Sequence, residues 1–256
     1  TMNGSTTVTS DNQTATCTIS RNGDLIHKVY VTTDSLPSSA AAGSNWEGSK
    51  LIKEVELEIG GQRIDRHYTE WNQVWDELCT DESKAVGLKA MKGDIGLRSD
   101  TVTSCTGVRS VQLPLNFWFC RNVGLALPLI ALQYHEVKLK FTWGLPATGA
   151  DQSYACNVVV DYIYLDTDER RRFAQVSHEY LIEQIQKYEV SAVSTTSVSA
   201  NLNFNHPVKE LIWTNESVIE QINDSLTDMS TVQLKLNGHD RFSEKKLEYF
   251  QLRQPY

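Results

Sequence analysis

The first candidates for a chemical role are His178 and Glu179. This pair opens like the first half of a zinc-binding HExxH helix, but Ile182 stands where the second histidine belongs. A helical zinc site of this kind needs both histidines on one face of the helix. The other histidines lie far from this pair in the sequence. The sequence therefore predicts no metal site here and favours an ordinary helix or loop surface.

A second chemical candidate is the charged run at residues 166–172. Acidic Asp166, Asp168 and Glu169 precede three arginines, Arg170, Arg171 and Arg172. Such a run could form an acid pair with a phosphate clamp, because guanidinium groups bind phosphate oxygens in pairs. The simpler interpretation is a helix with an acidic first turn that makes surface or inter-subunit ion pairs. In a chain of net charge −8, one basic triplet is weak evidence for nucleic-acid binding.

Further searches return no catalytic, cofactor-binding or metal-binding residues. There is no nucleophile elbow and no phosphate-binding glycine-lysine loop. The five cysteines are odd in number, widely spaced and without a CxxC pair, which argues against a disulfide framework and favours a reducing compartment. No signal peptide is visible at the start of the sequence. Four N-x-S/T sequons are candidate glycosylation sites, although polar β proteins produce such sequons by chance: Asn3, Asn12, Asn215 and Asn223.

The element that must hold any site in place is the apolar stretch 114–141. Residues 117–119 are aromatic and predict a buried strand, and a turn follows at 122–124. From residue 134 the pattern alternates, which puts His135 with Val137 on a buried strand face. The stretch is too short and too interrupted for a membrane span, which needs about 20 apolar residues.

The remaining pattern is that of an all-β chain. Strands are expected at 15–20, 25–33 and 155–165, and a hairpin joins 51–59 to 62–65 across two glycines, with Lys53 on the apolar face of its strand. Two short helices are expected, one capped by Thr69 and one capped by Asp166 or Thr167. Long loops are expected at 35–49, 80–107 and 144–152, and long loops in compact folds usually carry function or contacts.

The β pattern returns from residue 190 and includes an Asn-Gly hairpin turn at 237–238. We therefore expect one β domain at 1–172, a linker at 173–189 and the start of a second β domain at 190–256. The glycine turns at 60–61 and 238 are each followed by an arginine, which suggests two copies of one architecture.

Six collinear segments of the chain resemble the major capsid proteins of nucleocytoplasmic large DNA viruses, with the chlorovirus and iridovirus branches most similar. The segments are 18–26, 51–65, 117–137, 160–174, 202–213 and 236–242. The resemblance implies two consecutive jelly-roll β-sandwiches, a double jelly roll. Relative to that pattern the chain is expected to be truncated at both ends, with the first jelly roll lacking its N-terminal part and the second incomplete.

The resemblance also implies a structural role and no enzymatic activity. Three copies would form a pseudo-hexagonal capsomer, and capsomers would tile the icosahedral shell of the virion, assembled in the host cytoplasm. The implied partners are further copies of the chain, neighbouring capsomers and minor capsid proteins, with no direct nucleic-acid binding and only indirect contact with an inner membrane. Two alternatives are a carbohydrate-binding jelly roll, for which Trp46 and Trp71 are the candidate aromatics, and a cupin-type enzyme, whose His/His/Glu spacing is not present.

Overall fold

The computed structural model describes residues 2–3, 6–33, 48–92, 110–145, 153–190, 198–213, 231–254 and 256. Two compact units divide the chain, Thr1–Ala200 and Asn201–Tyr256. The expected loops 35–49 and 144–152 lie mostly outside the described residues, as does the part of the 80–107 excursion beyond residue 92.

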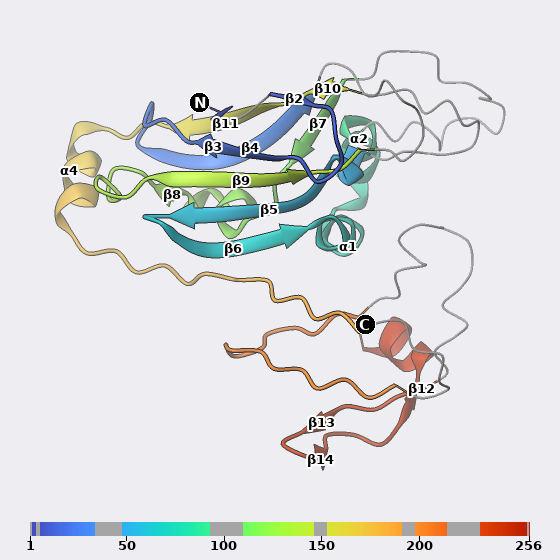
Figure 1. Ribbon diagram of the computed structural model, residues 1–256. Coiled ribbons are helices and arrows are strands. Elements are labelled where there is room, and N and C mark those ends of the chain that lie inside the picture. The colour runs from blue at the N-terminus through green and yellow to red at the C-terminus, as the bar shows by residue number, and fades with distance from the viewer. Residues whose placement is uncertain are drawn as a thin grey trace. The chain divides into compact units, whose positions relative to one another are not determined.

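The first unit is built on a five-stranded antiparallel sheet with the order β1-β3-β9-β5-β6 (Figure 1). Its strands are β1 (Met2–Asn3), β3 (Thr14–Thr18), β5 (Ile52–Ile59), β6 (Gln62–Tyr68) and β9 (Val137–Trp143). The β5–β6 hairpin forms as expected, because Gly60 (φ 60°) and Gly61 (φ 84°) adopt the left-handed backbone that a two-residue hairpin turn requires.

A second sheet has the order β11-β4-β7, and β8 also pairs with β4. Its strands are β4 (Leu25–Thr33), β7 (Val111–Pro114), β8 (Leu127–Pro128) and β11 (Asn157–Ile163), and a small separate pair joins β2 (Thr7–Val8) to β10 (Tyr154–Ala155). Strand β4 covers the predicted range 25–33, and β11 lies within the predicted strand 155–165.

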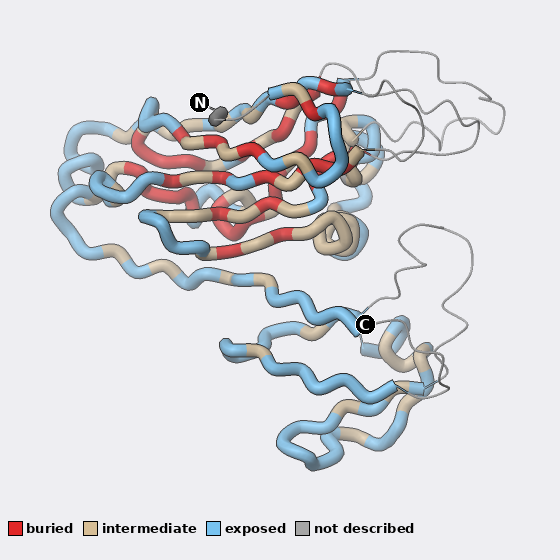
Figure 2. The backbone as a smooth tube through the Cα atoms, viewed as in Figure 1, coloured by how far each residue is buried: buried red, intermediate tan, exposed pale blue. Residues whose placement is uncertain are grey.

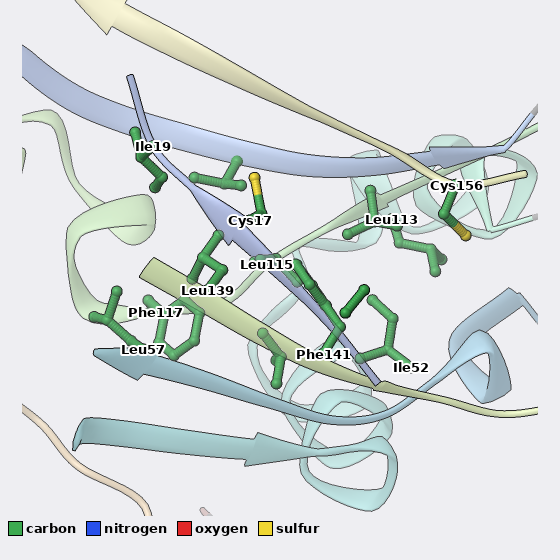
Figure 3. Packing of buried hydrophobic residues seen from close by; sticks show 14 of the residues in the cluster. Cys17, Ile19, Ile52, Leu57, Leu113, Leu115, Phe117, Leu139, Phe141 and Cys156 are labelled. Carbon is green, nitrogen blue, oxygen red and sulfur yellow. The ribbon is translucent and has the colours of Figure 1, made fainter. Parts of the chain in front are cut away.

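The core of the first unit lies between these two sheets. Val55, Leu57 and Phe141 from the five-stranded sheet and Val29 and Val31 from β4 are fully or almost fully buried. Figure 2 shows the buried residues concentrated inside this unit, and Figure 3 shows the inward-pointing side chains of several strands in contact. Alternate residues of β9 are buried, which confirms the predicted period of two.

The aromatic run 117–119 is buried as expected, but the predicted strand is wrong. Residues Trp118–Arg121 form a single helical turn, α3, followed by the 3₁₀ turn Val123–Leu125, where the Asn122 side chain accepts a hydrogen bond from the Gly124 amide at 2.8 Å. Three successive buried side chains do not suit a strand at a sandwich surface, where neighbouring side chains point to opposite faces. The turn directs all three inward.

The placements of Lys53 and His135 on buried strand faces are also wrong. A β-bulge between Ile52 and Glu54 leaves Lys53 exposed and without a Cα partner on β9, and Ile52 is buried instead. His135 precedes β9 and is exposed.

Two helices that follow β6 cover one end of the sandwich, and a third follows β11. They are α1 (Thr69–Cys79), α2 (Glu82–Met91) and α4 (Thr167–Gln175), with a 3₁₀ turn at Gly48–Leu51. The expected helices at 69 and 167 form, but neither predicted side-chain cap does. The Thr69 hydroxyl instead donates to the Ile52 carbonyl at 2.7 Å, which ties α1 to β5. The loop expected at 80–107 is wrong over residues 82–91, which form α2. No described helix is long and apolar enough to cross a membrane.

The second unit is sparsely packed: none of its described residues is buried. It holds two short antiparallel pairs, β12 (Thr231–Val232) with β15 (Lys245–Lys246) and β13 (Lys235–Leu236) with β14 (His239–Asp240), and a π-helical turn at Tyr249–Arg253. Asn237 and Gly238 form the predicted turn, both with positive φ, as at Gly60 and Gly61.

Truncating one core residue tests this packing. Leu57→Ala should lower the free energy of unfolding of the first unit by about 2–5 kcal/mol, because it removes a fully buried side chain from the inter-sheet core and leaves a cavity. Urea unfolding followed by tryptophan fluorescence measures this. Val86→Ala on α2, where the side chain is exposed, is the control and should change stability by less than about 0.5 kcal/mol. Equal effects would contradict the assignment of the core.

Candidate functional site

The chemically suggestive residues of the sequence take structural positions. His178 donates from Nε2 to the Phe173 carbonyl at 2.9 Å and stacks on the Phe173 ring, with centroids 4.8 Å apart. This contact closes the C-terminal end of α4. Among the described residues, no group of three or more His, Cys, Asp or Glu side chains could hold a metal ion.

The arginines of the charged run at 166–172 have different environments in the structure. Arg170 forms an ion pair with the buried carboxylate of Asp24, with Nε to Oδ1 at 3.0 Å, and the other Asp24 oxygen accepts from the Leu165 amide at 2.8 Å. This arrangement pins α4 to the start of β4. Arg171 and Arg172 are exposed. The observed pair fits the ion-pair interpretation rather than a phosphate clamp.

Two of the four sequon asparagines lie among the described residues. Asn12 occupies a tight turn with φ 61° and is exposed; its Nδ2 donates to Asp11 at 3.1 Å and its Oδ1 accepts from Lys53 at 3.0 Å. Asn3 lies in β1 and pairs with Thr16. Asn215 and Asn223 lie outside the described residues.

Trp71, the described one of the two aromatic candidates for sugar binding, does not form an open platform. Trp71 is half-buried between His67 and Trp75, with ring centroids 6.3 Å and 5.7 Å away. His67 is itself buried, and its Nε2 lies 2.8 Å from Asp65 Oδ2. Trp46 lies outside the described residues.

The outer face of the five-stranded sheet carries a cross-strand network of opposite charges. Glu56 pairs with Arg63 and with Arg66, and Glu54 pairs with Arg66 at 3.2 Å. Further along the same face, Lys140 pairs with Glu58. Such pairs fix strand register, and they leave this surface close to electrically neutral although the chain is acidic.

Two pKa shifts reflect this network. Partial burial alone would lower the pKa of Arg66, but hydrogen bonds with Tyr68 and Glu56 and the charges of Glu54 and Glu56 outweigh it, so the pKa is raised. At the far end of the face, the Lys138 ammonium holds the pKa of Glu136 below its usual value by a hydrogen bond and by its charge.

A groove of about 420 Å³ lies between α2 and strands β4 and β7. Leu88 and Met91 of α2 line it together with Val29 and Leu115, and Lys28 and Lys84 are also among its lining residues. A second cavity, beside Asn72 and Lys92, holds only about 10 Å³. The groove marks where the helical excursion meets the sandwich.

One set of contacts could not be found from the sequence. Arg121 pairs with Glu183 at 2.6 Å, and Lys187 pairs with Glu70 at 3.3 Å. The partners are far apart in the chain and belong to no motif, so only the three-dimensional structure brings them together. Both pairs attach residues 177–190 to the rest of the first unit.

Comparisons with known proteins agree with this architecture. A family model described as "Major capsid protein N-terminus" matches residues 2–166, and one described as "Large eukaryotic DNA virus major capsid protein" matches residues 169–256. The major capsid protein of Pyramimonas orientalis virus is 50% identical over 248 residues, which cover 94% of this chain and 62% of that protein. The major capsid protein of Paramecium bursaria Chlorella virus 1 is 36% identical, and the match covers 93% of this chain and 64% of that protein.

The solved structures agree as well. A quasi-atomic model of the PBCV-1 virus capsid matches with a TM-score of 0.77 at 32% identity, covering 100% of this chain and 72% of that chain. The fold is that of the jelly-roll proteins of viral capsids. The chain belongs to the family of major capsid proteins of large eukaryotic DNA viruses, and it spans 62% and 64% of the length of the two relatives described.

The Asp11–Lys53 contact generates a pH prediction. A hydrogen bond from Lys53 lowers the pKa of Asp11 below its ordinary 3.8. A lowered folded-state pKa adds stability at pH values above 3.8, and this contribution is lost as the pH falls through the folded-state pKa. Asp11→Asn should therefore lower the free energy of unfolding by about 0.2–1 kcal/mol at pH 6, a small effect because both side chains are nearly half exposed.

Urea unfolding of both proteins at pH 6 and pH 2.5 measures this difference. It should shrink at the lower pH, and Lys53→Gln should reproduce the profile. A difference that stayed constant with pH would contradict the assignment.

The cysteines generate a reactivity prediction. Burial raises the pKa of Cys120 and of Cys156 from 9.0 to about 12 and also raises that of Cys17, whereas Cys79 is exposed. The thiolate is the reactive form, so a three-unit rise makes its fraction about 10³-fold smaller. At pH 8, a disulfide reagent should label Cys79 in the native protein, and Cys17, Cys120 and Cys156 only after unfolding.

Peptide mass mapping of the labelled protein measures this. Cys79→Ser should leave these three thiols unlabelled under native conditions. Rapid native labelling of Cys156 would contradict the buried position.

Proposed function

We propose that this chain is part of a major capsid subunit that builds the outer shell of an icosahedral large DNA virus. The observation that carries the proposal is the match to the PBCV-1 capsid structure over the whole of this chain, at 32% identity. A likeness of this extent covers both units and their connection, beyond a single sandwich that could serve many functions.

The first unit has the physical properties that a shell component requires. Its interior is filled by side chains, its polar sheet face carries paired charges, and no described cluster suits metal chemistry. A rigid scaffold of this kind leaves its loops and faces for contacts with neighbours. We assign no enzymatic activity to the chain.

The assembly unit is a trimer of pseudo-hexagonal outline, in which each subunit supplies two similar jelly rolls. Residues 1–172 belong to the first, 190–256 begin the second, and 173–189 connect them. This division is supported by two family matches that meet between residues 166 and 169. The trimer packs against neighbouring capsomers and minor capsid proteins and makes no direct contact with nucleic acid. Assembly in the host cytoplasm is supported by Cys17, Cys120 and Cys156, which form no disulfide among the described residues.

The solution mass of the purified chain tests the trimer. Three copies of 28.9 kDa give about 87 kDa, and closed three-fold symmetry stops growth at that size. Multi-angle light scattering over a hundredfold concentration range should give a plateau at this mass. A constant mass of 28.9 kDa would contradict the proposal that these residues carry the trimer contact.

A further inference from the structure

Residues 177–190, here called the strap, follow the edge of the first unit. They leave α4 without regular secondary structure and run along β6 (Figure 1). Strand β6 ends the order of its sheet, and no other described strand pairs with its outer side. An unpaired edge presents a row of free N–H and C=O groups to any other strand. The strap therefore lies along an edge at which the sandwich could pair with another chain.

The strap is joined to β6 by two hydrogen bonds that involve side chains. The Gln184 amide donates to the Ile64 carbonyl, and the Ile185 backbone N–H donates to Asp65 Oδ1 at 3.0 Å. Ile64 is the extra residue of a β-bulge between β5 and β6, which leaves it without a Cα partner on β5. Among the described residues, no backbone-to-backbone hydrogen bond joins the strap to β6.

The first electrostatic anchor is centred on Arg121. Its guanidinium pairs with Glu183 of the strap at 2.6 Å and lies 3.7 Å above the Trp75 ring. Its Nε also donates to the Asn116 carbonyl at 3.0 Å. Two contacts besides Glu183 hold the arginine in place, so it is a fixed receptor for Glu183.

The second anchor is Lys187 of the strap, which pairs with Glu70 of α1 at 3.3 Å and lies 4.9 Å from the Tyr68 ring centroid. Partial burial alone would lower the pKa of Lys187, but its bond with Glu189 and the charge of Glu70 outweigh this and raise it. Both anchors combine an ion pair with an aromatic face, an arrangement that favours a cation.

Apolar burial contributes little to holding the strap. Leu181 is 87% exposed and Tyr188 is 50% exposed. Figure 2 shows the strap as exposed or half-buried along its length, unlike the strands beside it. A segment held mainly by partly exposed charged contacts can detach without unfolding the core, because such contacts are individually weak.

We propose that the strap is a releasable guard of the β6 edge: docked, it blocks strand pairing, and released, it exposes β6 as a pairing surface for a second copy of this chain. An antiparallel β6–β6 contact is self-complementary, so a two-fold pair can form from identical edges. The guard thereby suppresses edge-to-edge association outside the shell. The proposal stands on contacts within the first unit and does not depend on the capsomer.

A charge-neutral double substitution tests it. Glu183→Gln with Lys187→Gln removes both anchors and leaves the net charge at −8. The matched control, Asp81→Asn with Lys84→Gln, removes an ion pair at the start of α2 whose side chains are 74% and 77% exposed. Hydrogen exchange read by mass spectrometry follows peptides that cover the strap and β6. The release variant should exchange at least about tenfold faster there at low protein concentration, and the control should match the wild type.

Self-association completes the test. In the release variant, light scattering should show a concentration-dependent doubling of the particle mass relative to wild type, and β6 should regain protection in the associated species. Ile185→Pro removes the N–H that binds Asp65 without changing β6 or any charge, and it should give the same result. Unchanged exchange in both variants would show that these contacts do not hold the strap. Faster exchange without association would show that the docked strap does not block strand pairing.

Discussion

The first unit depends on one constraint: two antiparallel sheets must bury their apolar faces against each other. Phe141 and Trp143 stack at 4.8 Å within this interior, and neighbouring strands contribute the residues that close around them. Burial of this kind is the main favourable term in folding. Once the inward faces are fixed, the outward faces, the bulges and the helical excursion are free to vary. The polar and charged features therefore lie on the outside of a body whose shape they do not determine.

Charge on the outside of that body has two separate uses. On the sheet face, Glu54, Glu56 and Glu58 meet arginines and a lysine from adjacent strands, so the pairs reinforce a register that the core already sets. On the β6 side, Arg121 and Lys187 join segments that no backbone ladder connects. The first use supports structure that is present without it. The second helps to hold a segment that is otherwise joined to β6 by two hydrogen bonds.

Periodicity predicted the regular part of this fold and missed its irregular part. Strands β4 and β9 and the β5–β6 hairpin follow directly from alternation and glycine turns. The bulge at Lys53 has no such signal, because one extra residue changes the face without changing the composition. The turn at 118–121 was missed since aromatic residues suit both a buried strand and a buried helical turn. The resemblance predicted the family, which spacing alone did not provide, whereas the strap contacts lie 62 or more residues apart and required coordinates.

The two units differ in how much apolar surface they bury, and this burial is what stabilises a sandwich. Residues 1–200 enclose a continuous core, whereas the described residues of 201–256 cluster aromatic side chains such as Trp213 and Phe250, 4.9 Å apart, without burying any residue. Two-stranded pairs of this length are not stable alone in water. Among the described residues, these pairs lack the buried core that stabilises the first unit.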